Sequence, residues 1–380
     1  MSFGRKSPRR VFLFALLACV GTILLDSPSR AQTPSPALLV LEKSDNSLAI
    51  VNPETLKIIA RVPAGPDPHE IVASPDGKLA YISNYGGSDS TLNTISVVDL
   101  VAQKALPAIN LGALHSAHGL EFAGGKLYFT VETNKAIGRI DPATQTVEWV
   151  LGTGQDRTHM IVVAASLDRI ATSNVNSGTI SIIEQVTAAS PAPPPAGAGG
   201  NPPPNYGTPP GGVRKTWRVT SIPSGRGSEG FDISPDGKEI WAANAQDDTV
   251  TIIDVASKKA VQTFGVSVKH GNRLKFTPDG KRVLISGLGG GPNAGGPNLV
   301  VLDVESHKLV KELSLGGGSA GILVQPDGAR AYVAVSAKDK VAVVDLKTLE
   351  VAGEIPVGKG PDGLAYRTDA RAARGRGSAN

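Results

Sequence analysis

Residues 68–84 read PHEIVASPDGKLAYISN, and the Pro-Asp-Gly turn inside this stretch decides the fold. The turn recurs at Ser234-Pro-Asp-Gly237, Thr277-Pro-Asp-Gly280 and Gln325-Pro-Asp-Gly328, with degenerate copies at Ala123-Gly-Gly125 and Ser166-Leu-Asp168. Proline presets φ at the first turn position, aspartate bonds the local backbone, and glycine takes the positive φ. Each copy therefore predicts a tight turn between two strands.

The segments around each turn predict a repeating unit of four short antiparallel strands. An apolar run follows the turn, as in residues 79–83 and 331–335, and a second run ends in an acid. We expect these acids to cap the next turn rather than to do chemistry; they are Asp99, Asp254, Asp303 and Asp345. Without residues 1–31, 185–213 and 369–380, the remaining 308 residues give 44 for each of seven units, which is the length of a propeller blade.

The two ends of the chain complete the count of seven. The N-terminal region supplies only three strands, at residues 38–41, 47–51 and 57–62, and the C-terminal region supplies one extra innermost strand near 363–367. The sequence thus predicts an all-β fold over 32–368, a seven-bladed β-propeller closed by a blade that both termini share. Such a clasp removes two exposed sheet edges.

The stretch at 68–84 resembles the YVTN-type β-propeller repeat of bacterial and archaeal secreted and surface-layer proteins, and residues 331–335 (AYVAV) are close to the strand that names it. The resemblance covers nearly all of residues 37–367. It implies the propeller fold and export. It leaves the activity open, because similar repeats occur in propellers that resemble the lactonase, streptogramin-lyase and cytochrome d1 groups.

Residues 1–31 are interpreted as a signal peptide, with four basic residues before an apolar run of about 15 residues and a cleavage site after Ala31. We expect a periplasmic or extracellular protein with no transmembrane segment after cleavage. The Sec and twin-arginine routes both stay open, since Arg9 and Arg10 precede Val-Phe-Leu. A lipoprotein anchored through Cys19 is a less favoured alternative. Residues 185–213 form a Pro/Gly-rich insert predicted to be flexible in blade four, and 369–380 a disordered basic tail.

Composition excludes several classes of function. Residues 1–31 carry a net charge of +4, which equals that of the whole chain, so the mature protein is near neutral and shows no nucleic-acid footprint. The mature chain lacks cysteine, so it has no disulfide, and no C-x-x-C-H motif for covalent haem is present. We expect a monomer whose partner is a protein, a glycan or a small ligand.

Candidate site residues gather where each innermost strand begins. Five residues before the first position of each turn stand His69, His118, Glu229 and Asn272, and Asp362 is the expected counterpart in the shared blade. His159 and His270 fall two residues before the corresponding positions, so strand alternation places them on the same face. The sequence therefore predicts one mouth of the channel lined by His69, His118, His159, Glu229, His270, Asn272 and Asp362.

Two functions are compatible with this mouth. The first is a binding scaffold that presents the loop face to a ligand or partner. The alternative is a hydrolase or lyase that uses the His/Glu funnel, with or without a divalent metal, since imidazole and carboxylate groups serve as metal ligands and as general acids and bases.

Overall fold

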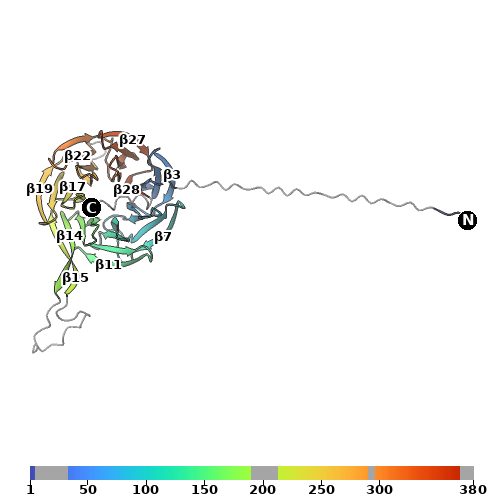
Figure 1. Cartoon of the computed structure of the whole chain (residues 1–380), viewed down its shortest axis with the longest axis horizontal. Helices are drawn as coiled ribbons and strands as arrows, with labels where there is room; N and C mark the ends of the chain where they lie inside the picture. Colours follow the sequence, from blue (N-terminus) through green and yellow to red (C-terminus); the bar gives the residue numbers. More distant parts are fainter. Residues whose placement is uncertain (5–32, 190–212, 290–295, 369–380) are drawn as a thin grey trace, which may run out of the picture. The chain divides into compact units, whose positions relative to one another are not determined.

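Seven four-stranded antiparallel sheets form a ring, so the predicted seven-bladed β-propeller is confirmed (Figure 1). The computed structural model describes residues 1–4, 33–189, 213–289 and 296–368. The ring lies within Gln32–Asn380, which separates from Met1–Ala31 as a unit of its own. Among the described residues, no helix has the length and apolar character needed to cross a membrane. Residues 5–31 of the proposed signal peptide, residues 190–212 of the insert and the tail at 369–380 lie outside the described residues.

The blades follow one another along the chain, and in six of them the innermost strand comes first, whereas in the shared blade it is the last strand of the chain. The shared blade has the order β28 (Pro361–Arg367), β1 (Ala37–Glu42), β2 (Ser47–Asn52) and β3 (Lys57–Pro63). The second and third blades contain β4 (Pro68–Ala73), β5 (Leu79–Asn84), β6 (Thr94–Asp99), β7 (Lys104–Asn110), β8 (Ala117–Ala123), β9 (Lys126–Val131), β10 (Ala136–Asp141) and β11 (Thr146–Gly152). The fourth and fifth contain β12 (Thr158–Val163), β13 (Arg169–Asn174), β14 (Thr179–Ala189), β15 (Val213–Pro223), β16 (Ser228–Ile233), β17 (Glu239–Asn244), β18 (Thr249–Asp254) and β19 (Lys259–Gly265).

The last two blades complete the ring. They contain β20 (Gly271–Phe276), β21 (Arg282–Gly287), β22 (Leu299–Asp303), β23 (Leu309–Leu313), β24 (Ile322–Val324), β25 (Arg330–Val335), β26 (Lys340–Asp345) and β27 (Glu350–Pro356). The described helical segments are the short 3-10 turns η1 (Lys43–Asp45) and η2 (Ser336–Lys338). We call the end of the channel where the innermost strands begin the upper face, and the end with the Pro-Asp-Gly turns the lower face.

The blade shared by the two termini closes the ring as predicted. β28 pairs antiparallel with β1, and Leu39 lies opposite Ala365. Arg367 at the end of β28 reinforces the joint, because its guanidinium donates to the carbonyl oxygens of Gly77 in the second blade and of Thr33 and Pro34. The last strand is therefore bound both to the first strand and to the neighbouring blade.

The turn chemistry predicted from the repeat is also confirmed. Gly77 has a φ of +68°, and Asp76 accepts hydrogen bonds from the Ser74 hydroxyl and the Lys78 N–H through Oδ1. The acid at the end of the third strand caps the next turn, as Asp99 does by accepting from the N–H groups of residues 101 and 102. These aspartates have structural roles.

One boundary differs from the sequence interpretation. Residues 185–189, assigned to the insert, continue β14 and pair with β15, from Gln185 opposite Trp217 to Ala189 opposite Val213. Polar and apolar residues alternate only weakly in this segment. The ends of β14 and β15 nevertheless pair with each other, so the β14–β15 hairpin extends outward from the ring (Figure 1). The insert in the fourth blade is shorter than predicted.

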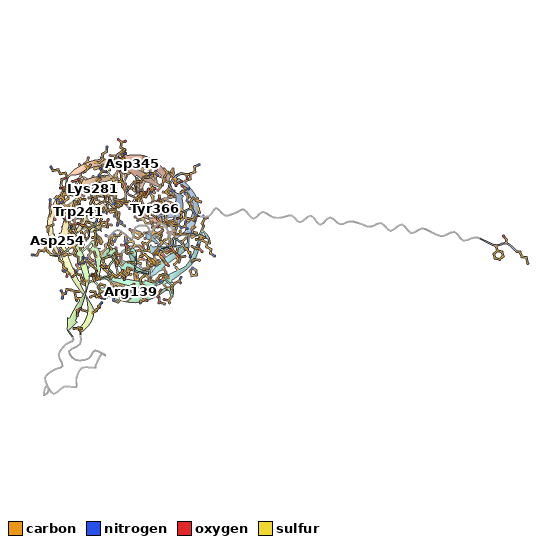
Figure 2. All side chains as sticks on the ribbon, in the orientation of Figure 1. Arg139, Trp241, Asp254, Lys281, Asp345 and Tyr366 are labelled. Carbon is orange, nitrogen blue, oxygen red and sulfur yellow. The ribbon has the colours of Figure 1, made fainter. Side chains whose placement is uncertain are left out.

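The apolar core lies between neighbouring sheets. One cluster joins Leu39 and Leu41 of the shared blade to Ile82 and Val98 of the second, all fully buried. In Figure 2, Asp254 and Arg139 lie at the rim of the ring, and Tyr366 lies nearer its middle.

Glycines let the innermost strands meet near the axis. Gly119, Gly230, Gly321 and Gly363 occupy the same position in four blades, and a Cβ on any of them would lie 2.1–2.6 Å from the backbone of the next blade. No side chain fits there without moving a neighbouring strand.

We expect Gly230→Ala to destabilise the ring by about 1–3 kcal/mol, because the new methyl would overlap the backbone of Arg273 at 2.5 Å. Urea unfolding followed by circular dichroism measures the change. Gly265→Ala is the matched control, since Gly265 lies in the outer strand β19 with nothing within 4 Å of the new atom. Equal stability of the two variants would contradict this interpretation of the channel.

Candidate functional site

Each blade contributes one residue to a ring at the upper face. In six blades it is the second residue of the innermost strand, and in β24 it comes two residues before the strand. This upper ring lines a cavity of about 170 Å³ and consists of His69, His118, His159, Glu229, Asn272, Ala320 and Asp362.

β-Bulges aim these side chains into the channel. Pro68 pairs with Asn84 and Ile71 pairs with Ile82, so His69 and Glu70 together face one residue of β5. Similar register shifts lie at the matching positions of β8, β12, β16, β20 and β28. A bulge bends its strand and redirects one side chain, which explains why successive blades deliver residues to one point.

Six of the seven side chains singled out in the sequence line this cavity, and His270 does not. In the fourth blade the first position of the turn is Ala164, not Ser166. The Ala164 N–H donates to the carbonyl of Arg169, just as the Ser74 N–H in the second blade donates to the carbonyl of Leu79. His159 is therefore five residues before the turn, like His69, and its predicted offset of two is wrong.

His270 precedes β20 rather than lying within it. It is exposed, its φ is +52°, and its N–H donates to Asp248. Strand alternation does not apply outside a strand, so the prediction that His270 faces the channel is wrong.

A second set of site residues was missed in the sequence. The residue directly after the second strand of a blade also reaches the upper face, and it is Lys43, Tyr85, Glu132, Leu288 or Ser336 in five blades. Tyr85 directly follows β5 and Leu288 directly follows β21. The sequence carries a signal for them, since each directly follows the apolar run that forms the second strand of its blade.

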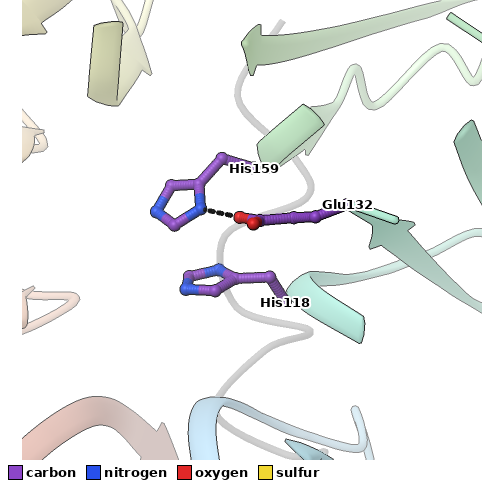
Figure 3. Close-up of side chains that lie close together, drawn as sticks. All are labelled: His118, Glu132 and His159. Carbon is purple, nitrogen blue, oxygen red and sulfur yellow. Dashed lines mark hydrogen bonds and ion pairs between the residues drawn. The ribbon is translucent and has the colours of Figure 1, made fainter. Parts of the chain in front are cut away.

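His118, Glu132 and His159 form the centre of the site (Figure 3). Each offers one ligand atom, and these three atoms lie within 4.8 Å of one another. Nδ1 of His159 donates a short hydrogen bond to Glu132, and the rings of His118 and His159 face each other with centroids 3.7 Å apart. All three side chains are buried.

Two nitrogens of this cluster have no hydrogen-bond partner in the described part of the chain, Nδ1 of His118 and Nε2 of His159. Burial and the neighbouring imidazoles lower the pKa of His118 well below its usual value, so its ring is neutral. Burial opposes a charge on His159 as well, but Glu132 and Glu229 outweigh it and raise the pKa of His159. Its Nε2 lies 3.4 Å from Oε1 of Glu229, close enough for electrostatic attraction without a well-formed hydrogen bond.

The carboxylates are fixed by other side chains. Oε2 of Glu132 accepts from the Tyr85 hydroxyl at 2.5 Å and from Nε of Arg157 at 3.2 Å. Although burial opposes ionisation, His159 and the nearby arginines hold the pKa of Glu229 at about 2. Glu229 also accepts from the Asn272 amide at 3.0 Å.

His69 lies at the edge of the cluster. Its ring contacts His118 edge-on, with centroids 5.2 Å apart, and its Nε2 lies 3.9 Å from Asp362. Burial lowers the pKa of His69 in spite of the Asp362 carboxylate. Asp362 in turn pairs with Lys43 at 3.1 Å.

The charges of the site favour a cation. Four carboxylates (Glu70, Glu132, Glu229 and Asp362) face three cations (Lys43, Arg157 and Arg273), so the site carries a net charge of −1 when its imidazoles are neutral. Lys43 pairs with Asp362 at 3.1 Å, Arg157 with Glu132 at 3.2 Å and Arg273 with Glu70 at 2.5 Å. None of these three cations is left to form an ion pair with Glu229. A proton on His159 or a bound metal ion would supply the missing charge.

The fold and this geometry define a class of protein, a seven-bladed β-propeller with a histidine–carboxylate centre at one mouth of its channel. No protein-family profile matches the chain, and comparison with curated proteins finds no match. The YVTN repeat family is therefore not established, and the propeller fold is.

Solved structures share the fold at low sequence identity. Hydrazine synthase of Kuenenia stuttgartiensis is 18% identical with a TM-score of 0.60, over 80% of this chain and 90% of that one. A functionally unknown protein from Desulfotomaculum acetoxidans is 12% identical with a TM-score of 0.66, over 88% and 99%. Dihydro-heme d1 dehydrogenase NirN in complex with DHE is 16% identical with a TM-score of 0.58, over 89% and 77%. At these identities the likeness concerns the fold alone.

Proposed function

We propose that this protein is an exported binding propeller that holds one divalent transition-metal ion at its upper face and binds a small ligand there. The observation that carries the proposal is the pair of buried imidazoles, His118 and His159, whose free nitrogens accompany a buried carboxylate. Buried polar atoms without partners are costly, and a metal ion would satisfy them.

The chemistry of the donors supports this class of ion. Imidazole nitrogens together with carboxylate oxygens suit zinc, copper, nickel and iron. Glu132 accepts from Nδ1 of His159, which leaves Nε2 as the ligand, in the arrangement common for metal-binding histidines. His118 and His159 would hold the ion, with Glu229 and His69 beside it.

Metal analysis of the purified mature protein tests the proposal. We expect about one equivalent of metal per chain, or stoichiometric uptake of Zn²⁺ by a chelator-treated sample in calorimetry. Affinity should fall as the pH drops, because the proton on His159 competes with the metal. A protein that is isolated without metal, takes up no Zn²⁺, Cu²⁺ or Ni²⁺, and melts identically with and without chelator would refute it.

A hydrolase or lyase is the second candidate, favoured by the hydrogen bond between Glu132 and His159. A carboxylate that orients a histidine is the usual arrangement of a general base. Gly317-Gly-Ser-Ala-Gly321 has the spacing of a nucleophile elbow, but β24 rather than a helix follows it, and the Ser319 hydroxyl donates to Gly317. Turnover of lactone substrates that is lost in His69→Ala and His159→Ala would favour this candidate over the binding protein.

Export and the repeat family complete the proposal. Membership of the YVTN-type propellers is supported by the residues at 68–84, and export by residues 1–31. Fractionation with N-terminal sequencing tests the second point, and we expect a periplasmic or secreted chain that begins at Gln32.

A further inference from the structure

The central channel contains a second cavity below the metal site. It has a volume of about 400 Å³ and is lined by the innermost strands of six blades. Pro326, from a Pro-Asp-Gly turn, is part of its wall, so this lower chamber reaches toward the lower face.

An ion pair separates the two cavities. Arg273 of the sixth blade spans the channel to Glu70 of the second blade, with Nη2 and Oε1 2.5 Å apart, and both side chains are largely buried. Arg273 lines both cavities, and Nη1 bonds to the backbone and side-chain oxygens of Asn272. The pair is the floor of the metal site and the roof of the lower chamber.

The wall of the lower chamber combines apolar and polar surface in similar amounts. Its apolar residues include Val72, Leu120, Phe122, Met160, Leu323 and Tyr366. A cavity of about 400 Å³ that combines apolar side chains with a few polar groups has the size and composition of a pocket for a small organic molecule.

The polar part of the wall includes the charged residues Glu70, Arg273 and Lys275, and a fourth one, Glu121. In the described part of the chain its carboxylate makes no hydrogen bond and no ion pair. Burial raises the pKa of Glu121 to about 7. The nearby charges act on this pKa in opposite directions, because Lys275 lowers it and Asp232 raises it. Lys275 itself lies 3.6 Å from Asp232, so it is already compensated.

We propose that the lower chamber binds a small amphipathic amine, whose ammonium group pairs with Glu121 and whose apolar body packs against Val72, Phe122 and Leu323. A half-buried carboxylate without a partner is costly, and a ligand cation would remove that cost. A metal ion suits the chamber poorly, because Glu70 already pairs with Arg273 and Glu121 is the one carboxylate left among the lining residues.

Calorimetry or ligand-observed NMR with 2-phenylethylamine and hexylamine tests the proposal at pH 8. We expect both amines to bind, the isosteric alcohol 2-phenylethanol to bind at least tenfold more weakly, and Glu121→Gln to weaken amine binding at least tenfold. Glu121→Gln should fold normally, since it removes no contact. His159→Ala separates the two sites, because it should leave amine binding unchanged even where metal binding is lost.

Three results would overturn the proposal. They are an absence of amine binding to the wild-type protein, amine binding that survives Glu121→Gln, and equal binding of the amine and the alcohol. None of these depends on whether the upper face binds metal, so the two proposals fail or stand separately.

Discussion

A chain that ends at Gly360 is expected to lose its cooperative fold. It lacks β28, so β1, whose six residues are all buried, becomes an exposed edge on the inner side of the shared blade. The variant also loses Arg367, which bonds to the second blade, and Asp362 of the upper ring. We expect the loss to exceed the roughly 5–15 kcal/mol by which domains are stable, because the ring can no longer close.

Size-exclusion chromatography and near-ultraviolet circular dichroism measure this outcome. The expected product is aggregated or expanded and has no sharp melting transition. A chain that ends at Thr368 is the control, because it removes only residues 369–380 and keeps β28 and all of its described contacts. If the chain ending at Gly360 melts as sharply as this control, the clasp does not hold the ring together.

His159→Ala is expected to reduce Zn²⁺ affinity by about 100-fold or more. It removes Nε2 as a ligand and, among the described residues, leaves the Glu132 carboxylate with Tyr85 and Arg157 as partners. Glu132→Gln keeps every ligand nitrogen but weakens the orientation of His159, so we expect the intermediate loss of about 10–100-fold that follows changes in supporting partners. Calorimetric titration of chelator-treated protein gives both values.

His270→Ala provides the matched control for His159→Ala. It removes the same side chain from an exposed turn outside the cavity, so Zn²⁺ affinity should not change. Melting temperatures show whether either variant is merely unfolded. Equal losses of affinity in the two variants would show that the binding measured is surface binding, and the proposed centre would have to be abandoned.

The position of the upper ring could be predicted because the repeat fixes it. Once the turn at Ser74–Gly77 is aligned with its copies, the second residue of each innermost strand follows by counting, and this finds His69, His118 and Glu229. The count failed in the fourth blade, where Leu167 takes the positive φ of the usual glycine and the turn has no Pro-Asp-Gly to mark it.

Contacts between blades could not be predicted by the same count. Glu132 is bound by Tyr85 of the second blade and by Arg157 and His159, which come from the loop before the fourth blade and from its innermost strand. Arg273 meets Glu70 across 203 positions of sequence. The bulges and the glycines recur at matching positions of the blades, but which side chains meet depends on how strands of different blades approach one another across the channel.

The sequence by itself determined the all-β class, the seven blades, the closure by both termini and the face that carries the histidines. These features repeat every 44 residues or so, and local turn chemistry and strand alternation encode them. Only the tertiary structure decided that His270 lies outside the site, that Glu132 lies at its centre, and that an ion pair divides the channel. The reason is physical: a repeat places each strand within its own blade, but the channel is built from single residues of all seven blades, and ring closure sets the distances between them.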